Sequence, residues 1–103
     1  MASSIGYTSI LSVRAGQEIT ASWQWYEERQ PGLGDRFVKN VVQRIEQIEQ
    51  FPERYTCRYK TYRETTIEVF PFSIIYRVNK KKRLVQVVSI FHSSRNPVRK
   101  YRK

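Results

Sequence analysis

Two runs of regularly spaced apolar residues, separated by one short turn, constrain the fold of this chain more than any other feature of its sequence. The first run has spacings of four, four and three, which place its members on one face of a helix: Ala15, Ile19, Trp23 and Tyr26. Ser12 precedes this run and is expected to cap the helix, which extends to Arg29. Trp25 falls off the stripe, so it either covers the helix pair or meets a partner.

The turn and the second run complete a pair of helices. Residues 30–35 contain Pro31, Gly32 and Gly34, which end the first helix, and Asp35 is expected to cap the next helix or to complement its dipole. The apolar members of the second run, which Phe51-Pro52 ends, are Phe37, Val38, Val41, Val42, Ile45 and Ile48. Two amphipathic helices joined by a tight turn form an antiparallel hairpin that needs a sheet to cover.

The remaining apolar residues supply that sheet. Residues 5–11 predict a short strand, and residues 61–70, 72–78 and 84–91 predict three more, separated by Pro71 and by a polar turn over residues 79–83. The last strand is almost entirely apolar, as expected of a central strand that is covered on both faces. We therefore predict one α+β domain over residues 1–103, with the order β-α-α-β-β-β, an antiparallel three-stranded meander and a basic tail at residues 93–103.

Composition excludes several classes of protein. A chain of 103 residues is one domain, and we find neither an apolar run long enough for a membrane span nor a secretory leader, so a cytoplasmic location is expected. Cys57 is the single cysteine, which excludes an internal disulfide; we interpret it as a half-buried structural thiol, since no motif supplies a base beside it. Without a phosphate loop, a zinc spacing or a dinucleotide fingerprint, we predict no cofactor and no metal.

The charge is strongly segregated along the chain. Residues 1–51 hold five basic and six acidic residues, whereas residues 52–103 hold 14 of the 19 basic residues and three acidic ones, a net charge of +11. A field of one sign attracts polyanions such as RNA, DNA or an acidic protein segment. Solubility alone does not require such segregation, so the C-terminal half is expected to dock an anionic partner.

Four segments, in order, resemble the RelE/ParE family of toxins from type II toxin-antitoxin systems, also called plasmid stabilisation proteins. They are residues 25–37 (WYEERQPGLGDRF), Pro52-Glu53-Arg54-Tyr55, residues 72–78 (FSIIYRV) and residues 88–97 (VSIFHSSRNP). The resemblance covers residues 5–97 and implies a growth-inhibiting toxin that an acidic antitoxin encoded beside it wraps and neutralises, in a hetero-oligomer. The last three segments are expected to fall where the family places its strands. RelE-like members cleave mRNA on the ribosome, whereas ParE-like members poison DNA gyrase and cleave nothing, and fold alone does not distinguish them.

A ribonuclease that uses the 2′-hydroxyl of its substrate needs a base, an acid and cations around the phosphorane. With an up-down-up meander, Glu64 and His92 are expected at opposite ends of the sheet, about 20 Å apart, which leaves His92, Glu68 and Arg95 as the only catalytic set. Ribonuclease members of the family usually carry arginine where this chain has Ser73, and often lysines where it has Thr65, Thr66 and Ile67. We therefore favour the ParE-like, noncatalytic interpretation, with mRNA cleavage as the alternative and a nontoxic nucleic-acid-binding module as a third.

The residues expected to bind the target or the antitoxin are the cations of the sheet and the tail: Arg63, Arg77, His92, Arg95, Arg99, Lys100, Tyr101, Arg102 and Lys103. Some of these assignments have plainer alternatives. His92 is as readily a hydrogen-bonded structural residue as a base. The run from Lys80 to Arg83 is most simply a solvated hairpin tip that blocks edge pairing, with a phosphate contact as the alternative.

Overall fold

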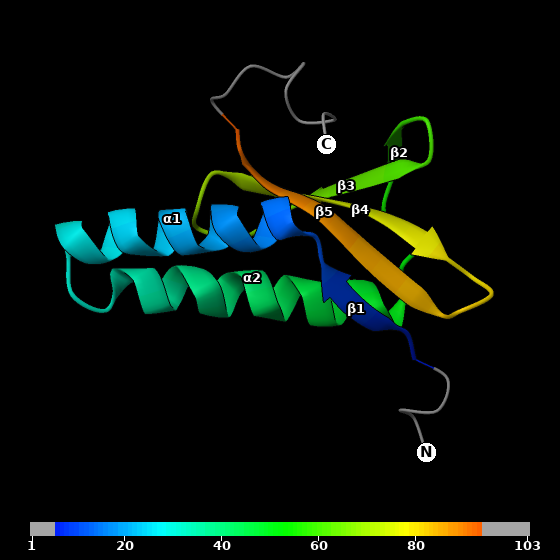
Figure 1. Cartoon of the computed structure of the whole chain (residues 1–103), viewed down its shortest axis with the longest axis horizontal. Helices are drawn as coiled ribbons and strands as arrows, with labels where there is room; N and C mark the ends of the chain where they lie inside the picture. Colours follow the sequence, from blue (N-terminus) through cyan, green and yellow to red (C-terminus); the bar gives the residue numbers. More distant parts are fainter. Residues whose placement is uncertain (1–5, 94–103) are drawn as a thin grey trace.

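The computed structural model describes residues 6–93 of the chain. Its elements are β1 (Thr8–Leu11), α1 (Val13–Arg29), α2 (Leu33–Gln50), β2 (Cys57–Tyr59), β3 (Tyr62–Thr66), β4 (Phe72–Asn79) and β5 (Leu84–His92). The two helices lie side by side along one face of a sheet (Figure 1). The predicted α+β fold, with a strand, a helix pair and then an antiparallel meander, is confirmed.

The helix ends are capped partly as predicted. The Ser12 hydroxyl accepts a hydrogen bond from the Ala15 amide (3.0 Å), so Ser12 is the expected N-cap of α1. Asp35 does not cap α2; Gly32, with φ +89°, is its N-cap, and Asp35 lies in the first turn and accepts from Trp23 Nε1 (2.8 Å). Glu27 of α1 instead accepts from the amides of Gly32 (2.7 Å) and Gly34 (2.9 Å). One helix therefore satisfies the free amides at the start of the other.

Gly34 allows the two helices to meet closely. A Cβ atom added at this position would lie 2.5 Å from the Trp23 carbonyl oxygen and 2.8 Å from the Trp23 ring. The backbone of α1 therefore occupies the space that any larger residue would need. Within residues 6–93, neither helix is long and apolar enough to cross a membrane.

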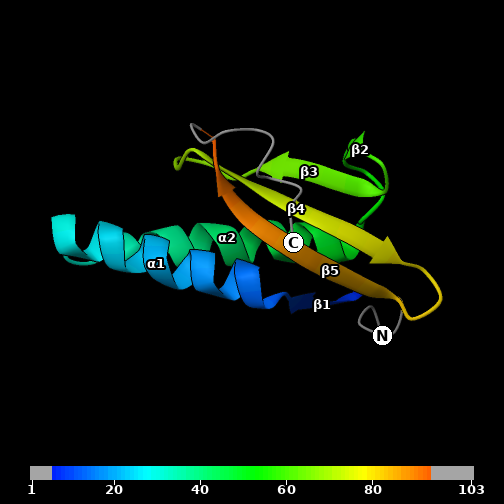
Figure 2. The ribbon, with the colours of Figure 1, turned by 45° about the horizontal axis from the view of Figure 1, so that its top comes forward.

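The sheet is mixed and joins the first strand to the last. Its order is β1-β5-β4-β3-β2, with β1 parallel to β5 and the other pairs antiparallel. Thr8 is opposite Leu84 and Leu11 is opposite Val87, so β1 covers only the first half of β5 (Figure 2). The predicted central position of the last strand is confirmed, since β5 lies between β1 and β4.

Three local predictions were wrong. The strand predicted over residues 61–70 ends at Thr66, because the chain turns through Val69 (φ +75°) and the Phe70 amide bonds back to the Glu68 carbonyl (2.8 Å). Pro52–Tyr55, expected among the strands of the family, forms turns after α2. Cys57, predicted to be a half-buried thiol, is exposed on β2. β2 itself was not predicted, because its three residues are all exposed and show no alternation.

Apolar side chains fill both faces of the central strands. The main core joins the helices to the sheet through Ala15, Phe37, Val41, Ile48, Ile67, Phe70, Phe72, Ile74, Tyr76, Val85, Val87 and Ile90. A second cluster consists of Tyr62, Ile75, Val88 and Phe91. Ile75 follows Ile74 on β4, so these two side chains point to opposite faces of the sheet. The Tyr76 hydroxyl, within the main core, donates to the Pro52 carbonyl (2.6 Å), and burial raises the Tyr76 pKa above its usual range.

Candidate functional site

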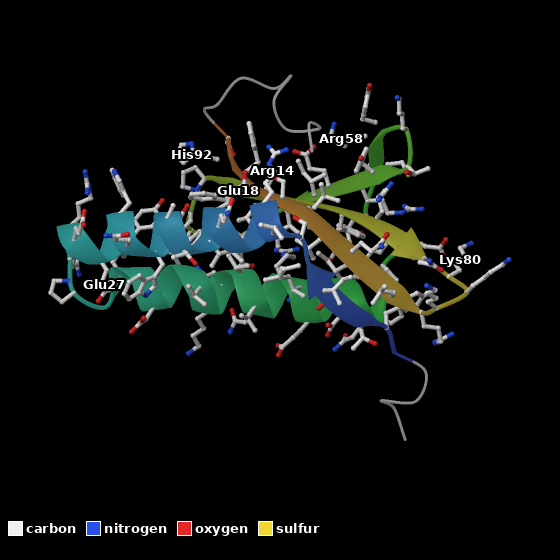
Figure 3. The ribbon with its side chains drawn as sticks, viewed as in Figure 1. Arg14, Glu18, Glu27, Arg58, Lys80 and His92 are labelled. Carbon is white, nitrogen blue, oxygen red and sulfur yellow. The ribbon has the colours of Figure 1, made fainter. Side chains whose placement is uncertain are left out.

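His92 is the last residue of β5 and lies between the sheet and α1. It pairs with Phe72 of β4, and the two rings meet edge to face with their centroids 5.0 Å apart. Next to it, the Ser93 amide donates to the Pro71 carbonyl (2.7 Å), which fixes the end of the strand. Figure 3 shows the His92 side chain beside α1, at the end of β5 away from the β4–β5 hairpin.

A hollow of about 630 Å³ opens beside His92, and we call it the His92 hollow. Its lining comes from α1, from the loop before β4 and from the sheet: Ala21, Ser22, Trp25, Tyr26, Pro71, Phe72 and His92. Trp25 is 52% exposed, and the Arg29 guanidinium lies 3.5 Å from its ring centroid. The Trp25 indole is therefore half-exposed, with Arg29 over one ring face and Tyr26 in edge-to-face contact.

Three aromatic rings and the imidazole line this hollow, together with Ala21, Ser22 and Pro71. Tyr26 contacts Phe70 edge to face, with a centroid distance of 4.9 Å, and burial raises the Tyr26 pKa. The hollow therefore offers ring faces and a single imidazole, an arrangement that suits a flat or apolar group of a partner.

His92 also lines a smaller, adjoining hollow of about 170 Å³, to which α1 contributes Arg14 and Glu18. Glu18 Oε1 accepts from the Ser89 hydroxyl and from the Ile90 amide, both at 2.8 Å, and Oε2 accepts from Arg14 Nε (3.1 Å). The Ile90 amide lies on β5 beyond the last residue paired with β1, so the Glu18 carboxylate replaces the missing strand there.

Sequence reasoning missed this pair of charged residues. The spacing of Arg14 and Glu18 at i and i+4 was visible and predicts an ion pair on the helix surface. The contact of Glu18 with Ser89, 71 residues away, had no sequence signal. Figure 3 labels both α1 residues and His92.

The predicted catalytic set is not brought together within residues 6–93. Glu68 lies in the loop between β3 and β4, beside α2, where it lines a hollow of about 40 Å³ with Asn40, Gln43, Arg44 and Gln47. Asn40 Nδ2 donates to the Glu68 carbonyl (3.0 Å). Glu68 thus lies against α2, whereas His92 lies against α1. Arg95 is outside the described residues.

Glu64 is nearer to His92 than expected. It pairs with Ile75 of β4, which pairs with Ser89 of β5, three residues before His92. Along the strand this is about 10 Å rather than 20 Å, because β3 ends two residues after Glu64 and a loop makes the connection to β4. Two strand spacings of about 4.8 Å each still separate the residues across the sheet.

Two of the predicted binding cations, Arg63 and Arg77, contact other parts of the fold, and the cations of the tail are not described. Arg63 Nη1 donates to the carbonyls of Tyr55 (2.6 Å) and Glu53 (3.1 Å), so its guanidinium holds the loop before β2. Arg77 lies over the Tyr62 ring, 5.4 Å from its centroid, and its buried Nε has no hydrogen-bond partner among the residues described. The predicted tail residues lie outside the described range: Arg95, Arg99, Lys100, Tyr101, Arg102 and Lys103.

The sheet row where ribonuclease members are expected to carry cations is neutral. Thr66 of β3 pairs with Ser73 of β4, which pairs with Phe91 of β5, and Ser73 is only 5% exposed. Cross-strand partners share one face of a sheet. This row therefore places a threonine, a buried serine hydroxyl and a phenyl ring where a charged phosphorane would need guanidinium or ammonium groups.

Within the described residues, the two halves of the sequence still differ in charge. Residues 6–51, mostly the helices, hold five basic and six acidic residues, whereas residues 52–93 hold nine basic and three acidic ones. Arg58 and Lys80, labelled in Figure 3, lie at the end of the sheet away from His92. The cations of the described sheet therefore gather near the β4–β5 hairpin rather than around the imidazole.

Comparison with known proteins gave one family and several solved structures. Residues 10–97 match the sequence profile of the family described as ParE toxin of type II toxin-antitoxin system, parDE. The chain is similar to one in the chromosomal ParDE TA system from P. aeruginosa, with a TM-score of 0.72 and 19% identity over 84% of this chain and 94% of that one.

Two structures from E. coli show the same fold. For a chain of the intact RelBE toxin-antitoxin complex the TM-score is 0.65, with 18% identity over 86% of this chain and 99% of that one. For the isolated RelE toxin the TM-score is 0.64, with 20% identity over 90% of each chain. A comparison with curated protein sequences gave no significant match.

Proposed function

The chain belongs to the ParE toxin family of type II toxin-antitoxin systems, and on this premise we propose that it inhibits growth by binding an essential target, DNA gyrase, without cleaving RNA. A cognate antitoxin with an acidic segment neutralises it. The observation that carries the proposal is the composition of the His92 hollow, where aromatic rings surround one imidazole. Such a lining suits the burial of a partner's side chain better than it suits proton transfer to a phosphodiester.

The carboxylates near His92 support binding rather than catalysis. Glu18 accepts hydrogen bonds from Ser89, Ile90 and Arg14, so its carboxylate fastens α1 to β5. Glu68 lies beside the other helix. The neutral row at Ser73 lacks the cations that stabilise the transition state, each worth about 3 kcal/mol by analogy with oxyanion-hole donors.

The antitoxin is expected to bind the basic half of the chain. Residues 52–93 carry a net charge of +6, whereas residues 6–51 carry −1. An acidic segment is therefore attracted most strongly to the sheet. The solved relatives named above include toxin-antitoxin assemblies, and a hetero-oligomer of this kind is proposed for this chain as well.

The first test of the target uses regulated expression in a bacterium and purified gyrase. Induction is expected to lower colony counts, and the purified chain is expected to inhibit supercoiling by gyrase. Trp25→Ala, which removes a half-exposed wall of the His92 hollow, is expected to weaken both effects. Deletion of residues 94–103 is expected to abolish growth inhibition, as the interpretation of the tail as a target-binding segment requires. If the chain were toxic on induction but left supercoiling by purified gyrase normal, gyrase would be excluded as the target.

Messenger RNA cleavage remains the alternative because His92 adjoins both Arg14 and Glu18. RNA sequencing or toeprinting after induction separates the two functions, since the ParE-like function predicts intact messages. A third possibility, a nontoxic nucleic-acid-binding module, predicts unchanged colony counts on induction.

A further inference from the structure

Another hollow, of about 420 Å³, lies where α2 ends and is separate from the site around His92. Its lining consists of Tyr7, Gln50, Phe51, Pro52, Glu53 and Arg54. The β4–β5 hairpin borders it, because Lys80 Nζ lies 2.9 Å from Glu53 Oε2 and the Arg83 guanidinium lies 5.0 Å from the centroid of the Tyr7 ring. Figure 3 shows Lys80 at this hairpin, distant from His92.

One exposed aromatic ring, that of Phe51, marks this surface. Phe51, the C-cap of α2, is 61% exposed. A partner that covered its ring would therefore bury a large apolar area. The Arg54 guanidinium lies 5.8 Å from its centroid. A ring that is both exposed and flanked by a cation is a platform on which a planar group stacks.

Cations surround these rings on the hairpin side. The loop contributes Lys80, Lys81, Lys82 and Arg83, and Arg54 adds a fifth positive charge. Glu53 is the one carboxylate in the lining; its hydrogen bond with Lys80 is the main cause of its lowered pKa. Even with Glu53 and the nearby Glu49 counted, this surface has a net positive charge.

We propose that this hairpin surface, formed by Tyr7, Phe51, Arg54 and residues 80–83, binds a single strand of nucleic acid, with a base stacked on Phe51 and the adjoining phosphates on the hairpin cations. A base stacked on Phe51 and phosphates held by lysines form an interaction that has no sequence requirement. This interaction is independent of the proposed target, since it uses the other end of the sheet.

A base fits the floor of this hollow better than a carboxylate does. The C-terminus of α2 presents carbonyl oxygens and a partial negative charge there, and Glu53 adds a second acceptor. Amino groups of a base suit these acceptors, whereas the side chains of an acidic peptide would meet like charge and have no ring to stack. The phosphates consequently belong on residues 80–83.

The test measures binding of the full chain to a fluorescent single-stranded oligonucleotide of about ten nucleotides by anisotropy, over a range of salt concentrations. Phe51→Ala is expected to weaken binding by about 5- to 100-fold, the effect of losing one stacked base, and Phe51→Trp is expected to restore it. The double variant Lys81→Ala/Lys82→Ala is expected to lower the slope of log Kd against log salt by about 1.4, for two lost phosphate contacts to a single strand.

Lys39→Ala, an exposed lysine on α2, is the matched control and is expected to leave the affinity unchanged, and circular dichroism checks that each variant folds. Three results would overturn the proposal: full affinity in Phe51→Ala, equal binding of an abasic oligonucleotide, or a polyglutamate probe that binds as tightly with the same dependence on Phe51. The last result would assign the surface to an acidic peptide instead. Neither gyrase inhibition nor toxicity enters this assay, so it succeeds or fails separately from the proposed function.

Discussion

The same substitution at two glycines is expected to have opposite effects on the stability of this fold. Gly16 of α1 has no atom within 4 Å of an added Cβ, whereas at Gly34 of α2 that Cβ would lie 2.5 Å from the Trp23 carbonyl oxygen. Alanine favours a helix over glycine by about 1 kcal/mol. Gly16→Ala should therefore stabilise the chain by about 0.5 to 1 kcal/mol.

Gly34→Ala gains the same helix propensity, but the steric clash with α1 costs more than this gain. The blocking atom belongs to the backbone of α1, so it cannot rotate away and the helices must separate, which costs roughly 1 to 3 kcal/mol. Separation also lengthens the bonds from Glu27 to the amides of Gly32 and Gly34, for about 1 kcal/mol more. The net effect is a destabilisation of about 2 kcal/mol, or a Tm lower by about 8 °C or more for a chain of this size.

Urea unfolding followed by circular dichroism and by tryptophan fluorescence measures both variants, and equal slopes would show that the unfolding transitions are comparable. A Gly34→Ala protein as stable as Gly16→Ala would refute the close approach of the two helix backbones. A Gly34→Ala protein that loses stability while Gly16→Ala gains it would support the reasoning.

Three further perturbations follow from the hydrogen bonds. Glu18→Ala should destabilise the fold by about 1 to 3 kcal/mol, since the buried Ile90 amide loses its acceptor, and hydrogen exchange at that amide should accelerate. Glu27→Gln should cost about 1 kcal/mol by weakening the cap of α2; an unchanged urea midpoint would argue against this role. The pKa of Tyr76 is raised in the folded chain, so the contribution of this residue to stability is complete below the unfolded pKa of about 10 and is lost as the pH rises above it. Tyr76→Phe should remove this loss of stability at alkaline pH while costing about 1 kcal/mol at neutral pH, because the hydrogen bond to Pro52 is absent. Thermal melting over a range of pH measures both effects.

Periodicity carried the fold prediction because each element buries one face against the main core. Of the two predicted stripes, Ala15, Phe37, Val41 and Ile48 are buried, and Ile19, Tyr26 and Ile45 pack partly buried against the core. Trp23, which was predicted to lie on the stripe of α1, is 37% exposed. The apolar run at residues 84–91 correctly predicted a central strand. Short, exposed elements such as β2 have no such signal, since nothing in them is buried.

The candidate site was predicted less well because it depends on contacts between distant residues. The sequence identified His92 but not the residues of α1 that adjoin it, Arg14 and Glu18. It paired His92 with Glu68, which the loop between β3 and β4 places beside α2. A loop of a few residues redirects a side chain to another helix, and loop geometry is the part of a fold that periodicity does not encode.

The pairing of β1 with β5 also determines when the sheet can form during translation. The partners Thr8 and Leu84 are 76 residues apart, and a ribosome that adds about 5 to 20 residues per second needs roughly 4 to 15 s between them. Until then a nascent chain has two amphipathic helices and no completed sheet. A chain that stops before Leu84 lacks β5, so β1 and β4 have no common partner and the sheet cannot form in this order.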